Sequence, residues 1–343
     1  MPICYANTRP MKKQILILLL FIAMGCNDTQ MENEKDQFPE LTGKYVGQKV
    51  PGLTPEIFAP NIVSTGMSEI NACFSPDYTE FLFSVVMPGN NFVIMSMKYN
   101  GQQWSAPEVA SFSGEYSEAD PFITADGKYL YYVSKRPIDS LQTPKTDWDI
   151  WRVENSNGEW TTPEHLDSDV NSDKDDIYPC LTKDGTLYFS SGRGGGNNRD
   201  IYYAKSNGNG FEPCVKLGET INKYWEGDLF ISPDEEYMIL RTYGRPAGNG
   251  LYITFNSNGE WSTPQNMGEE INKTGNEFCP MLDPDGKYFF FTSSQITTQE
   301  KSGEKLTYQK IKDEFIYSYK HPGMGRNDIF WVDSKIIDKY NKN

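Results

Sequence analysis

The feature that most constrains the fold of this chain is a unit of roughly 50 residues that recurs along it. Five turn aspartates mark the unit, with successive spacings of 49, 58, 50 and 51 residues: Asp77, Asp126, Asp184, Asp234 and Asp285. An aromatic residue shortly followed by proline is a second landmark, at Trp104, Trp160, Phe211 and Trp261. Two landmarks with one period indicate a tandem repeat of a single supersecondary unit.

Each unit predicts four short antiparallel strands. In the last unit EFCPMLD is followed by a Pro-Asp-Gly turn, an aromatic strand YFFFTS and a third strand DIFWV. Proline, aspartate and glycine are the residues that tight turns require. A four-stranded unit cannot bury both faces alone, so the units must pack around an axis as the blades of an all-β propeller. We count five blades; a six-bladed arrangement is the alternative.

The two ends of the repeat predict how the ring closes. The segment LTPEIFAP at residues 53–60 is similar to the fourth strands, whereas the last unit ends with its third strand near Val332. We therefore expect residues 53–60 to complete the last blade, which would remove a free sheet edge. The predicted propeller domain spans residues 51–335, and residues 336–343 are predicted to be a C-terminal tail.

The N-terminus predicts export. Arg9, Lys12 and Lys13 precede a short apolar run that ends before Cys26, and this run is too short for a permanent membrane span. The segment resembles the signal and lipobox of bacterial lipoproteins, which implies lipidation of Cys26. An ordinary secretory signal is the alternative. Residues 27–50 are expected to form a flexible acidic tether, similar to those of Bacteroidota lipoproteins, and we expect an outer-membrane lipoprotein on the periplasmic or cell-surface face.

Charge and composition narrow the possible partners. Without residues 1–26 the chain keeps 29 basic and 47 acidic side chains, a formal net charge of −18. Bulk charge of this sign excludes nucleic acid as a partner and limits membrane contact to the lipid anchor. We expect a monomer. Because the chain has only two histidines, a zinc site or a His-based triad is improbable. Four cysteines are expected to be small buried residues that fill space: Cys73, Cys180, Cys214 and Cys279.

The repeat resembles the TolB-type, WD-like propeller repeat over about residues 50–335. The resemblance rests on Pro-Asp at the first turn and on the later Asp-Ile-aromatic strand, as in DIYYA at 200–204. It implies a propeller fold but no single function, because such repeats serve many roles. The chain is too short for TolB's additional N-terminal domain and shows five units instead of six.

Acidic residues recur at fixed positions before each turn aspartate. All five residues eight positions before it are acidic: Glu69, Glu118, Asp176, Glu226 and Glu277. The residues six positions before it are Asn71, Asp120, Tyr178, Asp228 and Cys279. Strand alternation places both sets on one face, lining the channel. The carboxylates could then bind a polar ligand or calcium, or they could accept hydrogen bonds from the next blade or pair with arginines.

Further candidates lie outside that strand. Arg136, Arg193 and Arg245 follow second strands, and they could bind either a carboxylate ligand or the aspartates of the blades, such as Asp149, Asp200 and Asp328. Four aromatic residues break the repeat and are candidates for a binding rim: Trp148, Tyr224, Trp225 and Tyr243. Two insertions, near 137–147 and 295–326, also break it; the second is predicted to be a hairpin over one mouth of the channel.

Two functions fit these features. The first is a non-catalytic envelope lipoprotein whose propeller binds a protein or a glycan, because no nucleophile–base arrangement stands out. The second is a five-bladed, glycosidase-like enzyme with channel-mouth carboxylates, drawn from Glu118, Asp120, Glu226, Asp228 and Glu277. A glycosidase requires two carboxylates about 5–10 Å apart, one of them with a raised pKa. An assay of the wild type on a panel of glycans therefore discriminates between the two functions.

Overall fold

The computed structural model describes residues 38–139, 143–196, 198–297 and 305–341. It divides the chain into two compact units, Met1–Pro39 and Glu40–Asn343, and the second unit contains all the strands. The predicted signal, the lipidation site Cys26 and most of the tether lie outside the described residues. Among those residues, no helix is long and apolar enough to cross a membrane.

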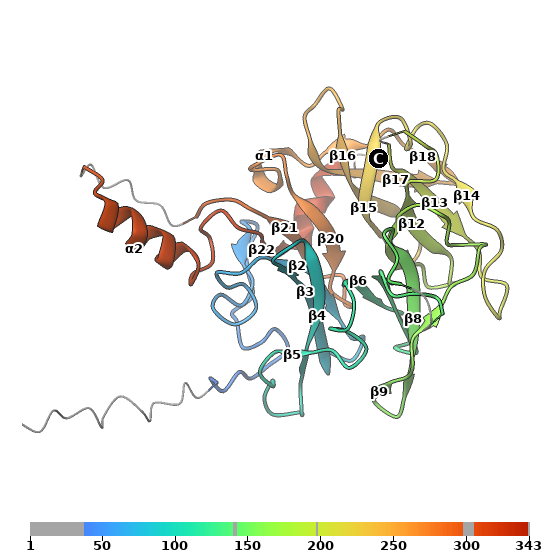
Figure 1. The fold of residues 1–343 in the computed structure, drawn as a ribbon. Coiled ribbons are helices and arrows are strands. Elements are labelled where there is room, and N and C mark those ends of the chain that lie inside the picture. Colours follow the sequence, from blue (N-terminus) through green and yellow to red (C-terminus); the bar gives the residue numbers. More distant parts are fainter. Residues whose placement is uncertain (1–37, 140–142, 197, 298–304, 342–343) are drawn as a thin grey trace, which may run out of the picture. The chain divides into compact units, whose positions relative to one another are not determined.

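Five antiparallel sheets follow one another along the chain and form blades 1 to 5 (Figure 1). Blade 1 contains β2 (Glu69–Phe74), β3 (Glu80–Met87), β4 (Asn91–Lys98) and β5 (Glu108–Val109). Blade 2 contains β6 (Glu118–Ile123), β7 (Tyr129–Ser134), β8 (Asp149–Ser156), β9 (Glu159–Trp160) and β10 (Glu164–His165). Blade 3 contains β11 (Asp176–Leu181), β12 (Leu187–Ser191), β13 (Asp200–Ala204) and β14 (Val215–Lys216).

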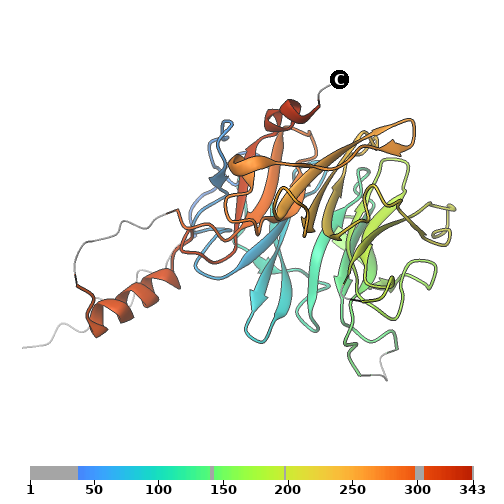
Figure 2. The same ribbon diagram turned by 90° about the horizontal axis from the view of Figure 1, so that it is seen from above.

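Blade 4 contains β15 (Trp225–Ile231), β16 (Tyr237–Tyr243), β17 (Gly250–Ser257), β18 (Glu260–Trp261) and β19 (Gln265–Asn266), and the short α1 (Gly268–Ile271) follows it. Blade 5 contains β20 (Phe278–Leu282), β21 (Tyr288–Ser293) and β22 (Asp328–Asp333). The five inner strands β2, β6, β11, β15 and β20 lie next to one another in order, and β20 lies next to β2. The predicted five-bladed propeller is therefore confirmed, and Figure 2 shows it from above.

The N-terminal strand closes the ring as predicted. β1 (Glu56–Ile57) pairs with β22, and Ile57 lies opposite Phe330. Blade 5 thereby gains the fourth strand that its own unit lacks, and β22 has no free edge at this point.

A β-bulge interrupts every inner strand. The pairing register shifts inside each one, and the residue six positions before the turn aspartate has a positive φ in all five: Asn71, Asp120, Tyr178, Asp228 and Cys279. In β2 the extra residue places Glu69 opposite Val85 but Cys73 opposite Leu82. Glu69 and Cys73 therefore lie on opposite faces, because alternation is reversed across the bulge. The unbroken alternation from which residues such as Glu69 and Asn71 were predicted to share one face was therefore wrong.

The compact unit is longer at both ends than the predicted domain. Tyr45 and Val46, expected in the tether, are buried, and Tyr45 packs against Tyr288 and Trp331 of blade 5. Residues from Ser334 onward form a 3-10 helix, η1 (Ser334–Tyr340), whose Ile336 and Ile337 are buried in the core between blades 4 and 5. Their apolar side chains order both segments, so neither is a free tail within the described residues.

The insertion in blade 5 contains a helix and not the predicted hairpin. α2 (Tyr308–Ser318) begins after Thr307, whose side chain accepts a hydrogen bond from the Lys310 backbone N–H. The helix extends away from the blades (Figures 1 and 2) and has no buried residue. Its apolar residues at three- and four-residue spacing, including Ile311 and Phe315, remain exposed.

The cysteines fill space between blades. Cys73, Cys180 and Cys279 are buried free thiols, whereas Cys214 is only half-buried. The Cys73 sulfur accepts a hydrogen bond from the Ile123 N–H of blade 2 at 3.3 Å, and Cys180 makes the same contact to blade 4. The prediction of small buried fillers is thus confirmed for three of the four.

Replacing Tyr45 tests whether the segment before β1 stabilises the propeller. Tyr45→Ala is expected to lower the free energy of unfolding by about 3 kcal/mol, because it empties a buried aromatic site. Tyr45→Phe is expected to cost about 1 kcal/mol, since it removes only the hydrogen bond to Asp283. Urea unfolding followed by tryptophan fluorescence measures both. Lys49→Ala, at an exposed residue of the same segment, serves as control and should change the free energy of unfolding little. If Tyr45→Ala changed it no more than Lys49→Ala, the segment before β1 would not stabilise the propeller.

Candidate binding site at the channel mouth

The five repeated carboxylates are structural. Glu69, Glu118, Asp176, Glu226 and Glu277 have an exposed fraction of 0 %. Each accepts hydrogen bonds from the loop that leads into its own inner strand; Asp176, for example, accepts from the Ser172 N–H at 2.6 Å and from its hydroxyl at 2.8 Å. An alternative prediction was that these carboxylates accept hydrogen bonds from the next blade. Their donors lie instead in the loop before their own inner strand. Their oxygen atoms tie the connecting loops to the inner strands.

The three predicted arginines complete this arrangement in blades 2, 3 and 4. Arg193 lies 2.7 Å from Asp176 and Arg245 lies 2.9 Å from Glu226, while Arg136 lies 3.6 Å from Glu118. Each arginine also donates to a backbone carbonyl of the same loop, at Phe112, Val170 or Ile221. These guanidinium groups are therefore engaged by carboxylates and carbonyls of the protein itself.

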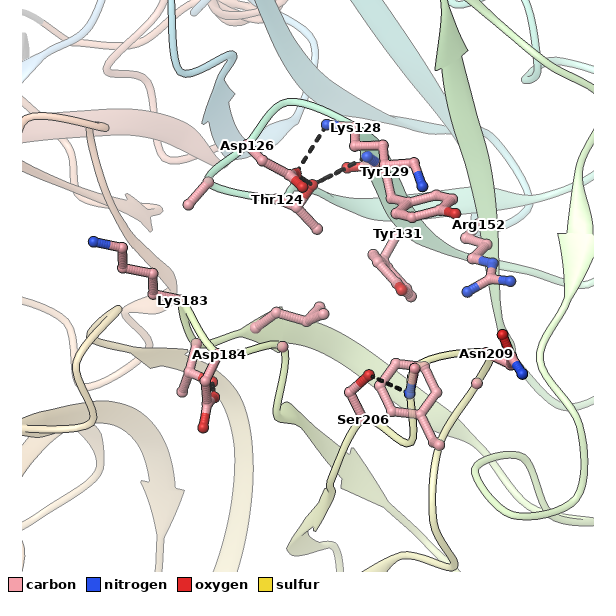
Figure 3. A pocket seen from close by; sticks show the side chains of 17 residues that line it. Thr124, Asp126, Lys128, Tyr129, Tyr131, Arg152, Lys183, Asp184, Ser206 and Asn209 are labelled. Atoms are coloured by element: carbon pink, nitrogen blue, oxygen red, sulfur yellow. Dashed lines mark hydrogen bonds between the residues drawn. The ribbon is translucent and has the colours of Figure 1, made fainter.

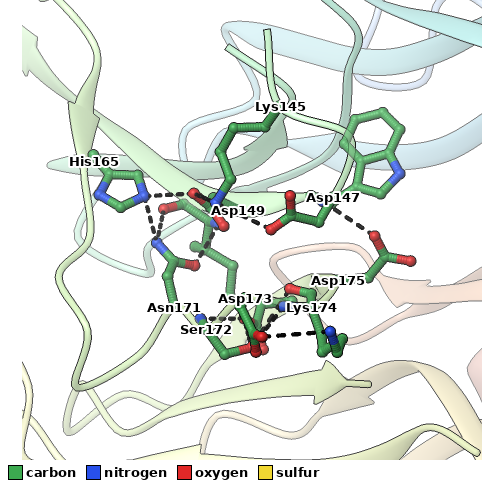
Figure 4. Close-up of polar contacts among 12 residues, drawn as sticks. Lys145, Asp147, Asp149, His165, Asn171, Ser172, Asp173, Lys174 and Asp175 are labelled. Atoms are coloured by element: carbon green, nitrogen blue, oxygen red, sulfur yellow. Dashed lines mark hydrogen bonds and ion pairs between the residues drawn. The ribbon is translucent and has the colours of Figure 1, made fainter. Parts of the chain in front are cut away.

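The aspartates that begin third strands are also buried within the blades. Figure 4 shows Lys145 and His165 converging on Asp149, at 2.5 and 2.7 Å. Asp200 pairs with Lys216 at 2.7 Å, and Asp328 accepts the Gly323 N–H at 2.8 Å. Neighbouring amides, such as that of Asn171, bond to the backbone of the same strands. This layer joins third strands to the loops beside them.

The bulge residues form an axial ring, which we define as Asn71, Asp120, Tyr178, Asp228 and Cys279. Their side chains meet across the axis: the Asn71 amide donates to Asp120 at 3.2 Å, and the Cys279 thiol lies 3.8 Å from the Tyr178 hydroxyl. A cavity of about 20 Å³ remains beside four of them, with Asp228 outside its lining, which is room for about one water molecule. The axial ring therefore closes the channel.

Burial governs the ionisation of the axial ring. Burial, and after it the charge of the neighbouring Asp228 carboxylate, raise the pKa of Asp120 to about 8. The pKa of Asp228 is also raised by burial, although the charge of Arg241 opposes this shift. The raised pKa of Asp120 favours its protonated form at neutral pH.

Above this floor, at the end of the channel where the inner strands begin, Arg241 lies in an aromatic setting. Its Nη1 is 3.4 Å from Asp228 and its Nη2 donates to Asn276 at 2.6 Å. The guanidinium lies over the rings of Tyr243 and Phe278, with centroid distances of 4.7 and 4.8 Å. Cation–π contacts of this kind stabilise an arginine that is largely withdrawn from water.

Aromatic and polar side chains continue around this end. Trp225 packs edge-on against Tyr243 at 5.2 Å. On the opposite side, the Trp148 N–H donates to Asp175, which accepts from Arg199 at 2.6 Å. Together these residues, contributed by all five blades, form what we call the mouth ring: Phe92, Trp148, Arg199, Trp225, Arg241, Tyr243, Asn276 and Phe278. Trp148, Trp225 and Tyr243 were predicted rim residues, whereas Tyr224 lies beside Arg245.

Sequence reasoning missed Arg199 and Arg241. Arg241 lies in β16, at a strand position that carries Ser84, Val133, Ser190 and Thr292 in the other blades. A charged residue at a position that is otherwise small and uncharged was the signal that could have revealed it. Arg199 occupies the position directly before a third strand, where blade 2 has Trp148.

Most polar groups at this end of the channel are engaged by other groups of the protein. Within residues 38–341, leaving aside the segments that the structure does not describe, no group of three His, Cys, Asp or Glu side chains is placed to hold a metal ion. The proposed calcium ligands are instead engaged by loop N–H groups, hydroxyls and arginines. Two guanidinium nitrogens of the mouth ring, Arg199 Nη1 and Arg241 Nε, have no partner among the described residues.

Comparisons with known proteins found similar solved structures but no family. No family model matches, and no curated protein matches. Among solved structures, TolB of Agrobacterium tumefaciens is 13 % identical with a TM-score of 0.45, covering 66 % of this chain and 70 % of that one. TolB of Acinetobacter baumannii is 14 % identical with a TM-score of 0.44 (77 % and 54 %). An α-L-arabinofuranosidase of Lactobacillus brevis is 12 % identical with a TM-score of 0.45 (79 % and 91 %). That the chain is a five-bladed β-propeller follows from its own sheets.

Asp120→Asn tests the ionisation of the axial ring. A carboxyl whose pKa is raised on folding stabilises the protein fully below its unfolded pKa near 4, and this stabilisation is lost as pH rises through about 8. Wild type should therefore lose stability relative to Asp120→Asn with a slope of up to about 1.4 kcal/mol per pH unit between pH 5 and 8.

Urea unfolding at several pH values measures this difference. Asp126→Asn is the matched control, because Asp126 is an exposed turn residue whose pKa is lowered by hydrogen bonds from Thr124 and Lys128, despite partial burial. It should leave the slope between pH 5 and 8 unchanged. Parallel curves for wild type and Asp120→Asn would show that Asp120 is ionised in the folded protein.

Proposed function

We propose that this protein is a non-catalytic binding module of the cell envelope, and that the mouth ring holds its protein or glycan ligand. The observation that carries the proposal is the gathering of aromatic rings and two arginines, from all five blades, above a closed channel floor. Because the axial ring leaves a cavity of only about 20 Å³, a ligand docks on the mouth and does not enter the channel.

The chemistry of the mouth ring favours a ligand with a flat apolar face and a carboxylate. Trp148, Trp225 and Tyr243 are half-buried and offer ring surface for a sugar face or an apolar side chain. Arginine is the side chain best suited to a planar anionic group, and the side chains of Arg199 and Arg241 are partly exposed at this end. Sugar acids and acidic peptide segments have both features.

The envelope location rests on the N-terminal sequence. The basic residues, the apolar run and Cys26 match a lipoprotein signal, and the acidic segment after Cys26 suits a tether. A lipid at Cys26 would hold the propeller near a membrane surface, where the protein meets envelope proteins and glycans.

The glycosidase alternative finds less support in the geometry. An acid and a base must reach the glycosidic bond through accessible carboxylates. Glu118, Glu226 and Glu277 are fully buried and bonded to their own loops. Asp120 and Asp228 are exposed by only 7 % and 1 % and belong to the channel floor. None of the five presents a carboxylate to a substrate on the mouth.

Trp225→Ala tests the mouth ring as the binding surface. Removing a central aromatic residue of a binding surface is expected to weaken ligand binding about tenfold or more. Oligogalacturonate, as an acidic glycan, and a neutral glucan oligosaccharide serve as probes in titration calorimetry. Trp261→Ala is the matched control, because Trp261 is equally half-buried but lies on the outer part of blade 4, and it should change affinity less than about twofold.

A protein ligand is tested by photo-crosslinking in intact cells. A crosslinking amino acid at position 225 should capture a specific envelope protein if the ligand is a protein, whereas the same group at position 261 should not. The mouth ring would be refuted as a binding surface by two results together. Neither glycan would bind in calorimetry, and crosslinking from position 225 would capture the same proteins as crosslinking from position 261.

A further inference from the structure

The pockets on the propeller body recur from blade to blade, and for that reason they do not single out a ligand. One of about 710 Å³ lies between blades 2 and 3 on the side of the Pro-Asp turns (Figure 3), and another of about 520 Å³ lies between blades 3 and 4. A third, of about 1110 Å³, lies beside η1 on blade 4. Among the described residues, α2 is the only helix between the second and third strands of a blade, so the repeat does not explain it.

The base of α2 is fixed on the propeller body. The backbone of Tyr319, directly after the helix, lies against Gly66 of the loop before β2, where a side chain would not fit. The guanidinium of Arg326 lies over the Tyr319 ring at 3.8 Å, and the ring of His321 stacks on Tyr317 at 3.8 Å. These contacts hold the C-terminal end of α2, and the remainder of the helix projects from the body (Figures 1 and 2).

One apolar face of α2 is not covered by any described part of the chain. Tyr308, Ile311, Phe315 and Ile316 have the spacing that gathers side chains on one side of a helix, and all four are exposed, Phe315 by 62 %. An isolated helix of 11 residues is only marginally stable in water, because helices in proteins depend on the packing of such a face. The length and the exposure of α2 therefore indicate a docking surface.

Neither the undescribed segments after Cys26 nor a bilayer surface suits this face. The longer of those segments, 27–37 and 298–304, are almost entirely polar in sequence: NDTQMENEKDQ and TQEKSGE. Helices that lie on bilayers are rich in lysine and arginine, whereas α2 has two lysines balanced by one aspartate and one glutamate. The chain without residues 1–26, with 29 basic and 47 acidic side chains, also has a net charge of −18, which opposes contact with anionic lipid.

The order of charges along α2 is complementary to that of a second α2 running in the opposite direction. Lys310 and Lys312 come first along the helix, and Asp313 and Glu314 follow. In an antiparallel pair, the basic part of each helix lies beside the acidic part of the other. A parallel pair would place like charges together, which is unfavourable.

The apolar residues have the same symmetry. Ile311 and Phe315 lie two residues on either side of Asp313, which is the middle residue of α2. A two-fold axis near Asp313 therefore places Ile311 of each copy next to Phe315 of the other. This reciprocal pairing is what a symmetric dimer requires.

We propose that α2 is a dimerisation helix, and that two copies of this protein associate through antiparallel packing of their α2 helices. The interface is small, because α2 spans 11 residues, whereas stable interfaces bury about 1,200 Å² or more. The dimer is therefore weak, with a Kd of about 100 µM, and it differs from the monomer that the sequence predicts. It does not depend on the function proposed for the mouth ring.

Sedimentation equilibrium of the chain from residue 27 onward, between about 10 and 500 µM, measures this association. Phe315→Ala should weaken dimerisation about tenfold, and it should keep the helix, because alanine has the highest helix propensity. Leu53→Ala is the matched control. Leu53 is an apolar residue outside α2 that is similarly exposed, by 60 %, so its removal should leave the Kd of the dimer unchanged.

Exchanged charges test the pairing itself. Lys310→Glu with Lys312→Glu makes α2 acidic, and Asp313→Lys with Glu314→Lys makes it basic. Each double variant alone should dimerise about fivefold more weakly than wild type, because like charges then meet. An equal mixture of the two variants should regain at least the wild-type affinity, and this recovery would also show that both variants are folded.

Three results would overturn the proposal. The first is a wild-type protein that remains monomeric up to about 500 µM. The second is a Phe315→Ala variant that dimerises as tightly as wild type. The third is a mixture of the two charge variants that associates no more tightly than either variant alone.

Crosslinking in intact cells identifies what covers α2. A crosslinking amino acid at position 311 should give a product of two copies of the chain, linked near Phe315 of the second copy. A product linked to another protein or to lipid would assign the apolar face to that partner instead and overturn the dimer. A product linked at position 311 of the second copy would show a parallel pair and overturn the antiparallel arrangement.

Discussion

The bulge in each inner strand is the constraint on which the rest of the propeller depends. It requires a left-handed backbone at five non-glycine residues, which asparagine and aspartate tolerate best and which costs about 1 kcal/mol or more for Tyr178 and Cys279. The bulge reverses the alternation of side chains between the two faces of the strand. The carboxylate at its start faces its own leading loop, while the bulge side chain faces the axis. Both the anchoring of the loops and the closed channel floor follow from this single device.

Repeated and unrepeated residues consequently have different roles. The five buried carboxylates recur in every blade and hold the leading loops, and arginines reinforce three of them. Every blade needs its loop held in the same way, so symmetry at these positions signals structure. The mouth ring is asymmetric: Arg241 has no charged counterpart in the other blades, and Trp225 has none among the repeat landmarks. A ligand is recognised by such asymmetry, because a single ligand cannot satisfy five identical sites at once.

Much of the fold could be predicted because the turns and the ends of strands require particular residues, which can be recognised in the sequence. The Pro-Asp turns set the blades, and the similarity of residues 53–60 to a fourth strand revealed the closure by β1. The bulge could not be predicted, because nothing in residues such as Tyr178 or Cys279 indicates a positive φ. Strict alternation therefore placed the carboxylates in the channel, and the arginines of the mouth ring were overlooked. α2 was misjudged because its apolar residues pack on nothing in the described structure.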